Sequence, residues 1–189
     1  MSTASTVGAV IVVHAGNRVD EPGRNPPRFP SDREGCVRER FDALLDLLEP
    51  HGVVTSAAAG ADLLLAQAAI ARVIPLHLVL PFDAERFRIH SVADRGERWV
   101  DAYQAALSTV AHDRGGSLRV LDCPRDDEGF RAANAALIER ACELAPGRVL
   151  AATVRPHGGG DPPSVTDHFV QRAHAARLFI VEIDPLTCD

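Results

Sequence analysis

The sequence predicts an α/β fold in which a mostly parallel sheet of about six strands is covered by helices on both faces, giving three layers. Two observations predict this doubly wound arrangement. Short apolar runs rich in β-branched residues alternate with amphipathic segments along the whole chain, which is typical of parallel strands joined by right-handed helical crossovers. The 189 residues also contain no internal repeat and no low-complexity linker, so a single domain over residues 1–189 is expected.

The first strand is expected at residues 7–13, a continuous apolar run like that of a parallel strand buried on both faces. A proline-rich loop follows as far as Pro30. Its length favours a ligand-covering role, with a solvated surface loop as the alternative. Ser31 is expected to cap a helix that runs to about Glu49, with an acidic residue in its first turn. Pro50 ends this helix.

Strands and helices alternate from His51 onward. The further strands are expected at residues 51–56, 75–81, 117–121, 148–154 and 177–183. The next helix is expected to reach Val73, and the later ones are expected at 83–90, 95–111, 127–145 and 164–175. This order is that of a Rossmann-like domain, in which ligands bind beyond the carboxyl ends of the strands.

Composition excludes several classes of function. The formal net charge of -6 argues against a general nucleic-acid binder, which would need a basic face. All 20 basic residues are arginines, so a P-loop lysine and a lysine general base are excluded, and any anion clamp must use arginine or backbone N–H groups. No apolar run approaches the length of a membrane span, and the polar N-terminus lacks the basic region of a signal peptide.

The four cysteines are widely separated, and no two form a C-x-x-C pair. Neither a zinc site nor a small disulfide framework is therefore predicted, and reduced thiols in a cytoplasmic protein without metal or cofactor are expected. The histidines form no H-E-x-x-H pattern. The dinucleotide fingerprint and the G-x-S-x-G elbow are also absent, which disfavours an NAD dehydrogenase and an α/β-hydrolase.

The chain is organised around residues 53–65, where a β-branched run passes through very small residues into a helix of Ala and Leu. Small side chains let the backbone approach a ligand, and a helix that begins there directs free N–H groups into the crevice above the strand. The alternative is that the small residues only allow close packing of helix and strand. The sequence leaves both interpretations open.

Candidate site residues stand at the carboxyl ends of four predicted strands. The candidate ligand-binding residues are His14, Gly16, Asn17, Arg18, Ser56, Ala57, Gly60, Asp62, Pro81, Phe82, Arg86, Gly158, Gly159 and Thr166. Weak candidates for catalysis are Asp62, Asp167 and Arg86. Gly16, Gly60 and Gly158 are expected to line one pocket.

Some of these residues also have structural explanations. Asp62 could only cap its helix, His14 could be a hydrogen-bonded, half-buried histidine, and Phe82 could belong to the core. The glycines at 158–160 could be a flexible linker.

Two of these segments resemble motifs of one superfamily. Residues 56–62, Ser-Ala-Ala-Ala-Gly-Ala-Asp, resemble the S-G-x-A-x-G-I-D turn of the DNA-processing protein A family. The late glycine-rich loop with Thr166 resembles the P-G-G-x-G-T loop of the Lonely Guy, lysine-decarboxylase-like family. Both families belong to the Rossmann-like SLOG superfamily. Residues 14–20, followed by Pro-Gly-Arg at 22–24, make the chain look most similar to the bacterial branch found beside signalling modules.

The resemblance implies that the chain binds a nucleotide or a nucleotide-derived ligand. Lonely Guy enzymes cleave the N-glycosidic bond of a nucleoside monophosphate with an Arg and a Glu that follows the motif Thr. Here Thr166 is followed by Asp167, His168 and Phe169, and Val165 replaces the motif glycine. This departure puts the hydrolase activity in doubt.

Three functions are therefore weighed. The first is a binding or sensor domain for a nucleotide-like ligand. The second is a phosphoribohydrolase with Asp167 or Asp62 as the acid and Arg18 or Arg86 as the anchor. The third is a DNA-handling domain, which the acidic balance disfavours because single-strand binding needs a positive groove. A homodimer is expected only as a general tendency of soluble α/β proteins.

Overall fold

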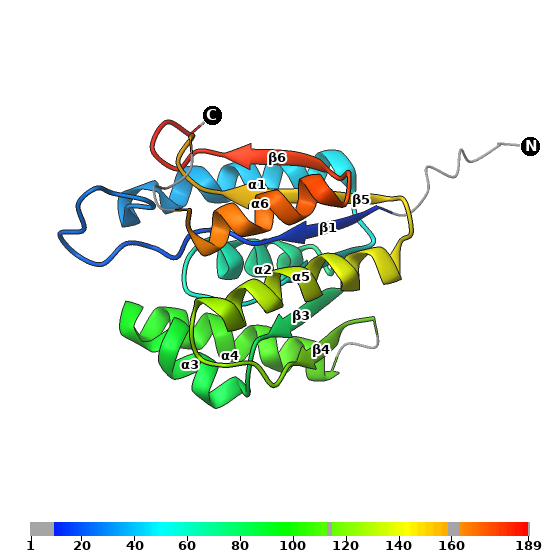
Figure 1. Ribbon diagram of the computed structural model, residues 1–189, viewed down its shortest axis with the longest axis horizontal. Helices are drawn as coiled ribbons and strands as arrows, with labels where there is room; N and C mark the ends of the chain where they lie inside the picture. Colours follow the sequence, from blue (N-terminus) through cyan, green and yellow to red (C-terminus); the bar gives the residue numbers. More distant parts are fainter. Residues whose placement is uncertain (1–9, 113–114, 159–162, 189) are drawn as a thin grey trace, which may run out of the picture.

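The computed structural model describes residues 10–112, 115–158 and 163–188 and confirms the predicted fold class. One sheet of six parallel strands has the order β4-β3-β2-β1-β5-β6. Its strands are β1 Ile11–His14, β2 Gly52–Thr55, β3 Leu76–Leu80, β4 Ser117–Val120, β5 Val149–Val154 and β6 Phe179–Ile183. Helices cover both faces of this sheet (Figure 1).

The helices lie within a few residues of the predicted ranges. They are α1 Glu34–Leu48, α2 Ala61–Ala71, α3 Ala84–Ser91, α4 Glu97–His112, α5 Asp127–Leu144 and α6 Val165–Ala175, with short 3₁₀ turns η1 Ser31–Arg33 and η2 Ala93–Arg95. On one face α2 packs between α1 and α4, and on the other α5 packs against α6. The apolar residues accordingly form two core clusters, one on each side of the sheet.

The burial of each element follows from its place in these layers. β1, β2 and β3 are buried along their whole length, because helices cover both of their faces. In α1 the buried residues Val37, Phe41 and Leu45 recur every four positions and form a single apolar stripe. The Ala- and Leu-rich α2 is buried on most of its circumference, because it lies between two other helices and the sheet.

The strand order places the topological switch point at β1. From β1 the chain proceeds outward through β2 and β3 to β4, and α5 then returns it to the other side of β1, where β5 and β6 follow. β1 therefore pairs with β2 on one side and β5 on the other. The loops after β1 and β5 diverge above this point, which is where open α/β sheets leave a crevice.

Two sequence expectations are corrected by the structure. Ser31 does not cap α1, because the 3₁₀ turn η1 precedes the helix and places Arg33 at its N-terminal cap position, without a side-chain capping bond. Nor are all four cysteines reduced, since Cys36 and Cys188 form a disulfide across 152 residues of sequence. Spacing along the chain gave no sign of this pair, because folding alone brings α1 and the end of the chain together.

None of the helices in the described part of the chain is long and apolar enough to cross a membrane. A cytoplasmic location and a homodimer stay predictions from the sequence.

Candidate functional site

A pocket of about 500 Å³ lies at the carboxyl edge of the sheet. A volume of this size suits a small organic ligand. Its wall is built from the loop after β1, the turn before α2, the end of α3, the first turns of α5 and the start of α6. Its lining includes the predicted residues Gly16, Asn17, Arg18, Ser56, Asp62 and Thr166.

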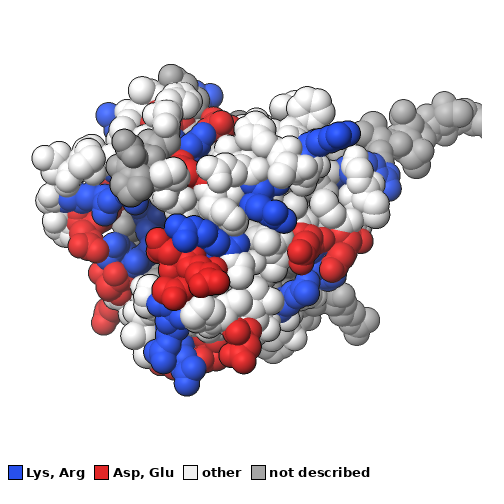
Figure 2. All heavy atoms as spheres, viewed as in Figure 1, with Lys and Arg blue, Asp and Glu red and all other residues white. Residues whose placement is uncertain are grey.

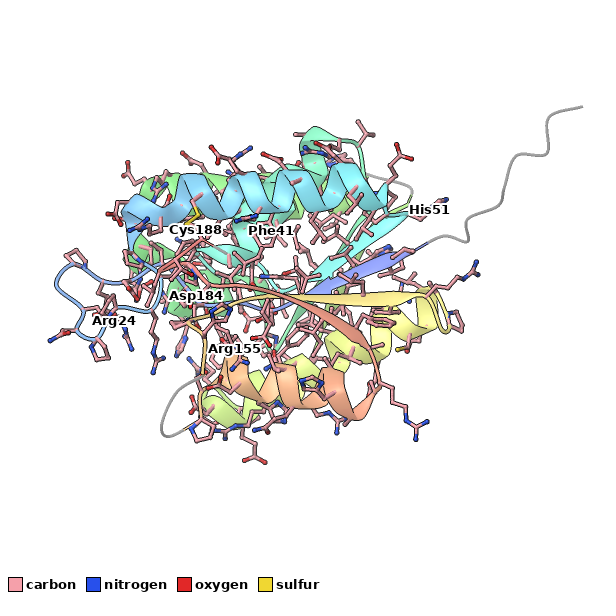
Figure 3. The ribbon with its side chains drawn as sticks, turned by 90° about the horizontal axis from the view of Figure 1, so that it is seen from above. Arg24, Phe41, His51, Arg155, Asp184 and Cys188 are labelled. Carbon is pink, nitrogen blue, oxygen red and sulfur yellow. A yellow bond between two sulfur atoms is a disulfide. The ribbon has the colours of Figure 1, made fainter. Side chains whose placement is uncertain are left out.

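The long loop after β1 forms one side of this pocket. Residues 15–21 line it, together with Arg24 and Arg28. The ligand-covering role of this loop stays a prediction. Asp20 closes the base of the loop, because its Oδ2 accepts the backbone N–H groups of Arg28 and Phe29 at 2.8 and 2.9 Å. Phe29 is fully buried and anchors the C-terminal part of the loop in the core. Figure 3 shows Arg24 on the projecting part, at the end of the sheet opposite His51.

Asp62, in the first turn of α2, holds two loops of the pocket together. Its Oδ1 accepts the backbone N–H of Gly16 at 3.3 Å, and its Oδ2 accepts that of Ala58 at 3.2 Å. The Nδ1 of His14 lies 3.2 Å from Oδ1. The carboxylate therefore does more than cap a helix, because it ties the loop after β1 to the turn after β2. Each of its oxygens already accepts a backbone hydrogen bond, which makes Asp62 a poor candidate for a catalytic acid.

His14 is fully buried beneath the pocket and does not line it. Besides Asp62, its Nδ1 lies 3.4 Å from the Thr55 hydroxyl, and its ring meets Phe41 edge-on with centroids 5.2 Å apart. Its Nε2 is buried without a hydrogen-bond partner among the described residues. His14 was predicted to bind the ligand, with a hydrogen-bonded, half-buried histidine as the alternative; in the structure it is a fully buried core residue in contact with Asp62.

Gly60 brings two backbone segments together and does not line the pocket. Arg18 and Gly60 form an isolated antiparallel bridge. A Cβ on Gly60 would lie 2.4 Å from the Val19 backbone nitrogen, and the residue has a φ of +129°. Only glycine fits this contact. Gly60 therefore serves close packing of the turn against the loop after β1, whereas Ser56 and Ala58 of the same turn line the pocket.

A second polar cluster lies at the switch point, between the loop after β1 and the start of α6. The Thr166 hydroxyl donates to Asn17 Oδ1 at 3.0 Å. The Asn17 backbone N–H donates to the Val154 carbonyl at 2.8 Å, and Asn134 Nδ2 of α5 donates to the Val165 carbonyl at 2.8 Å. Asn17, Asn134 and Thr166 all line the pocket, so this end of it is polar and internally hydrogen-bonded.

Asp167 faces away from the pocket, as its position one residue beyond Thr166 predicted. Its Oδ2 accepts the backbone N–H and the hydroxyl of Ser164 at 2.7 and 2.8 Å, in a capping box at the start of α6. Its Oδ1 accepts from Arg155 Nη1 at 2.6 Å. Arg155 also bonds Glu182 of β6. This carboxylate therefore stabilises the helix start and the end of β5.

Among the described residues, four arginines line the pocket, and most of them are tied to acidic partners. Arg18 pairs with Asp94, and Arg95 bonds Asp94, Glu21 and the Val19 carbonyl. Burial lowers the pKa of the Arg18 guanidinium, and the neighbouring Arg95 lowers that pKa further. Arg18 nevertheless stays charged, because the ordinary pKa of arginine lies far above neutral pH.

The other two arginines belong to the projecting loop and are freer to meet a ligand. With the described residues, Arg24 makes one long ion pair, to Asp20, with 3.4 Å between Nε and Oδ1. Arg28 is exposed, and its guanidinium makes no ion pair with any described residue. These two side chains are the cations most available to an anionic group of a ligand.

Of the remaining predicted residues, those that the structure describes do not line the pocket. Pro81 and Phe82 are buried behind its wall. Arg86 is exposed on α3, where its Nε pairs with Asp83 at 3.1 Å. The residues that complete this group are Ala57, which is buried, and Gly158, which has open space around it. Gly159 lies outside the described residues.

Gly16, Gly60 and Gly158 thus share one edge of the sheet, but only Gly16 lines the pocket. The prediction that all three line it is corrected. At Gly60 the loop after β1 packs against the turn and fills the space that a ligand would need.

Sequence reasoning missed the contribution of α5. Asp127, Phe130 and Asn134 line the pocket from the first turns of this helix, which follows the carboxyl end of β4. The sequence placed these residues after the predicted fourth strand, but β4 lies at the edge of the sheet, far from the switch point. Only the crossover of α5 from β4 back to β5 brings these residues to the wall of the pocket.

No known family model matches this chain, and neither does any curated protein. Among solved structures, the chain is similar to DNA processing protein A (DprA) from Streptococcus pneumoniae, with 14% sequence identity and a TM-score of 0.42. The match covers 92% of this chain and 58% of the DprA chain. This is a likeness of fold at low identity, and it indicates neither a ligand nor an activity.

Proposed function

We propose that this chain binds a nucleotide or a nucleotide-derived ligand in the pocket at the carboxyl edge of its sheet. The observation that carries the proposal is the meeting, in one cavity of about 500 Å³, of arginines from the loop after β1, the polar start of α6 and aromatic side chains of α3 and α5. A phosphorylated ligand carries both groups that such a wall recognises, an anion and a flat ring.

The anionic group has two sources of binding energy. Ser164, Val165 and Thr166 line the pocket at the start of α6, where backbone N–H groups and the helix dipole favour negative charge. Arg24 and Arg28 reach the same cavity from the projecting loop. No lysine is present in the chain, so the clamp uses the planar, bidentate guanidinium group.

Binding is favoured over hydrolysis of the N-glycosidic bond, the second function considered. That reaction needs a carboxylate beside the sugar, by analogy with glycoside hydrolysis. The two aspartates considered for it are both engaged. Asp62 holds the backbone of two loops, and Asp167 caps α6 and pairs with Arg155.

A DNA-handling role has less support. Arginine and acidic side chains lie next to one another over the face seen in Figure 2, and the chain carries a net charge of -6. A sequence-independent single-strand site needs a positive groove that follows the backbone.

Titration calorimetry with AMP tests the proposal. Wild-type protein is expected to bind AMP, and Arg28→Ala is expected to weaken binding by about 1–3 kcal/mol, the scale of a lost charge-assisted hydrogen bond. Arg86→Ala is the matched control, because Arg86 is an exposed arginine at the same edge of the sheet that does not line the pocket. If AMP does not bind, or if both variants bind it as the wild type does, the proposed site is wrong.

A further inference from the structure

The aromatic side chains of the pocket are gathered at one end of it. Phe87 and His90 come from α3, which follows β3, and Phe130 comes from the first turns of α5, which follows β4. All three line the pocket. β3 and β4 are neighbours at one side of the sheet, so these rings lie above that side.

These rings form part of a packed aromatic cluster with a graded exposure. Phe82 and Phe87 are buried, with centroids 6.0 Å apart. Phe130 is half-buried against Phe82, with ring centroids 5.9 Å apart, and its ring lies 5.5 Å from that of the exposed His90. Phe82 also meets the His90 ring at 6.1 Å, so one buried ring supports both outer rings, and Phe130 and His90 present a partly exposed aromatic surface to the cavity.

The polar end of the pocket lies above the other part of the sheet. Asn17 follows β1 and Thr166 follows β5, and their side chains bond each other at the switch point. β3 and β5 are separated in the sheet by β2 and β1, which makes three strand spacings. At about 4.8 Å for each spacing, the two ends of the pocket are roughly 14 Å apart. The cavity therefore suits an elongated ligand with chemically different ends.

We propose that Phe130 and His90 form a ring-stacking subsite that determines the specificity of the pocket. This inference rests on the proposed function and gives the ligand an orientation. Its aromatic ring lies on Phe130 and His90 above β3 and β4, and its anionic group lies near the start of α6 and the arginines of the loop after β1. The expected ligand is then a compound that joins an aromatic base to a phosphate. A sugar phosphate without a base cannot make the stacking contacts with Phe130 and His90.

The test compares three probes, AMP, adenosine and ribose 5-phosphate, in titration calorimetry. Wild-type protein is expected to bind AMP about tenfold more tightly than ribose 5-phosphate, because stacking of one base on an aromatic side chain accounts for a factor of this order. Phe130→Leu is expected to remove this advantage and to leave the affinity for ribose 5-phosphate unchanged. His90→Ala, a change at an exposed residue, is expected to weaken AMP and adenosine in the same direction.

Phe179→Leu is the matched control, since Phe179 is an 83% exposed phenylalanine on β6 that does not line the pocket. It is expected to bind all three probes as the wild type does. The leucine at position 130 keeps an apolar contact with Phe82, and thermal unfolding of each variant checks that it is folded.

The outcomes separate this inference from the proposed function. Equal binding of AMP and ribose 5-phosphate, unchanged in Phe130→Leu and His90→Ala, overturns the stacking subsite and leaves the anion site standing. Binding of adenosine that depends on Phe130, with no gain from a phosphate, supports the subsite and overturns the anion site. If the wild type binds none of the three probes, both proposals fail.

Discussion

Asp62→Asn separates a structural role of this carboxylate from a chemical one. Asp62 is 5% exposed, and each of its oxygens accepts a backbone N–H, from Gly16 at 3.3 Å and from Ala58 at 3.2 Å. In the asparagine variant one oxygen becomes an NH₂ group. That group faces either the Gly16 N–H and His14 or the Ala58 N–H, and it cannot accept a hydrogen bond from them.

The expected loss follows from these contacts. A hydrogen bond to a charged group contributes about 1.5–3 kcal/mol, and a buried donor left without a partner costs about 1–3 kcal/mol. The two bonds are long for their type, which favours the lower ends of these ranges. Asp62→Asn is therefore expected to lower the free energy of unfolding by about 2.5 kcal/mol, a large part of the 5–15 kcal/mol typical of a domain.

Urea unfolding measures this loss directly. Asp101→Asn is the control, because Asp101 is exposed on α4, and a surface change of this kind is expected to stay within about 0.5 kcal/mol. If Asp62→Asn unfolds at the wild-type urea concentration yet abolishes ligand binding, the reasoning is refuted. Asp62 would then act on the ligand and not on the two loops.

Three further predictions follow from other contacts. The Cys36–Cys188 disulfide joins residues 152 positions apart in the sequence, so its reduction is expected to lower the midpoint of thermal unfolding by removing up to about 5 kcal/mol of chain-entropy stabilisation. Equal midpoints with and without dithiothreitol would contradict this. In the control variant Cys36→Ser, the midpoint should not respond to reductant. Chromatography of the protein incubated with AMP is expected to show no free adenine, because Asp167 is held by Ser164 and Arg155; steady release abolished by Asp167→Asn would instead favour the phosphoribohydrolase. Arg18→Ala is expected to weaken binding of a phosphorylated ligand by about 1–3 kcal/mol, and equal affinity in a titration would remove Arg18 from the site.

The fold could be predicted from the sequence because its signals are local. The β-branched runs that form β2 and β3, and the four-residue spacing of the buried positions in α1, depend only on residues close to one another. Helix-breaking residues such as Pro50 predicted the ends of helices and strands to within a few residues. The start of α1 is the exception, because a 3₁₀ turn there competes with a side-chain cap.

The site could be predicted only in part. Parallel strands place all their carboxyl ends at one edge, so the sequence located the region and brought Gly16, Arg18 and Thr166 to the pocket wall. The sequence did not predict that the backbone of Arg18 and Val19 fills the space beside Gly60. Two segments more than 40 residues apart meet at that contact, and no local pattern encodes their meeting.

The sequence by itself determined the class of the fold, the edge of the sheet that carries the pocket, and the fact that every basic side chain is an arginine. Each of these follows from the composition or from the local alternation of strand and helix patterns. The tertiary structure decided which side chains face the cavity. It placed His14 in the core, gave Asp62 two backbone donors, and placed Phe130 of α5, the helix that follows the edge strand β4, at the wall of the pocket. The physical reason is that helix crossovers and loop packing set these contacts, and both depend on residues far apart in the chain.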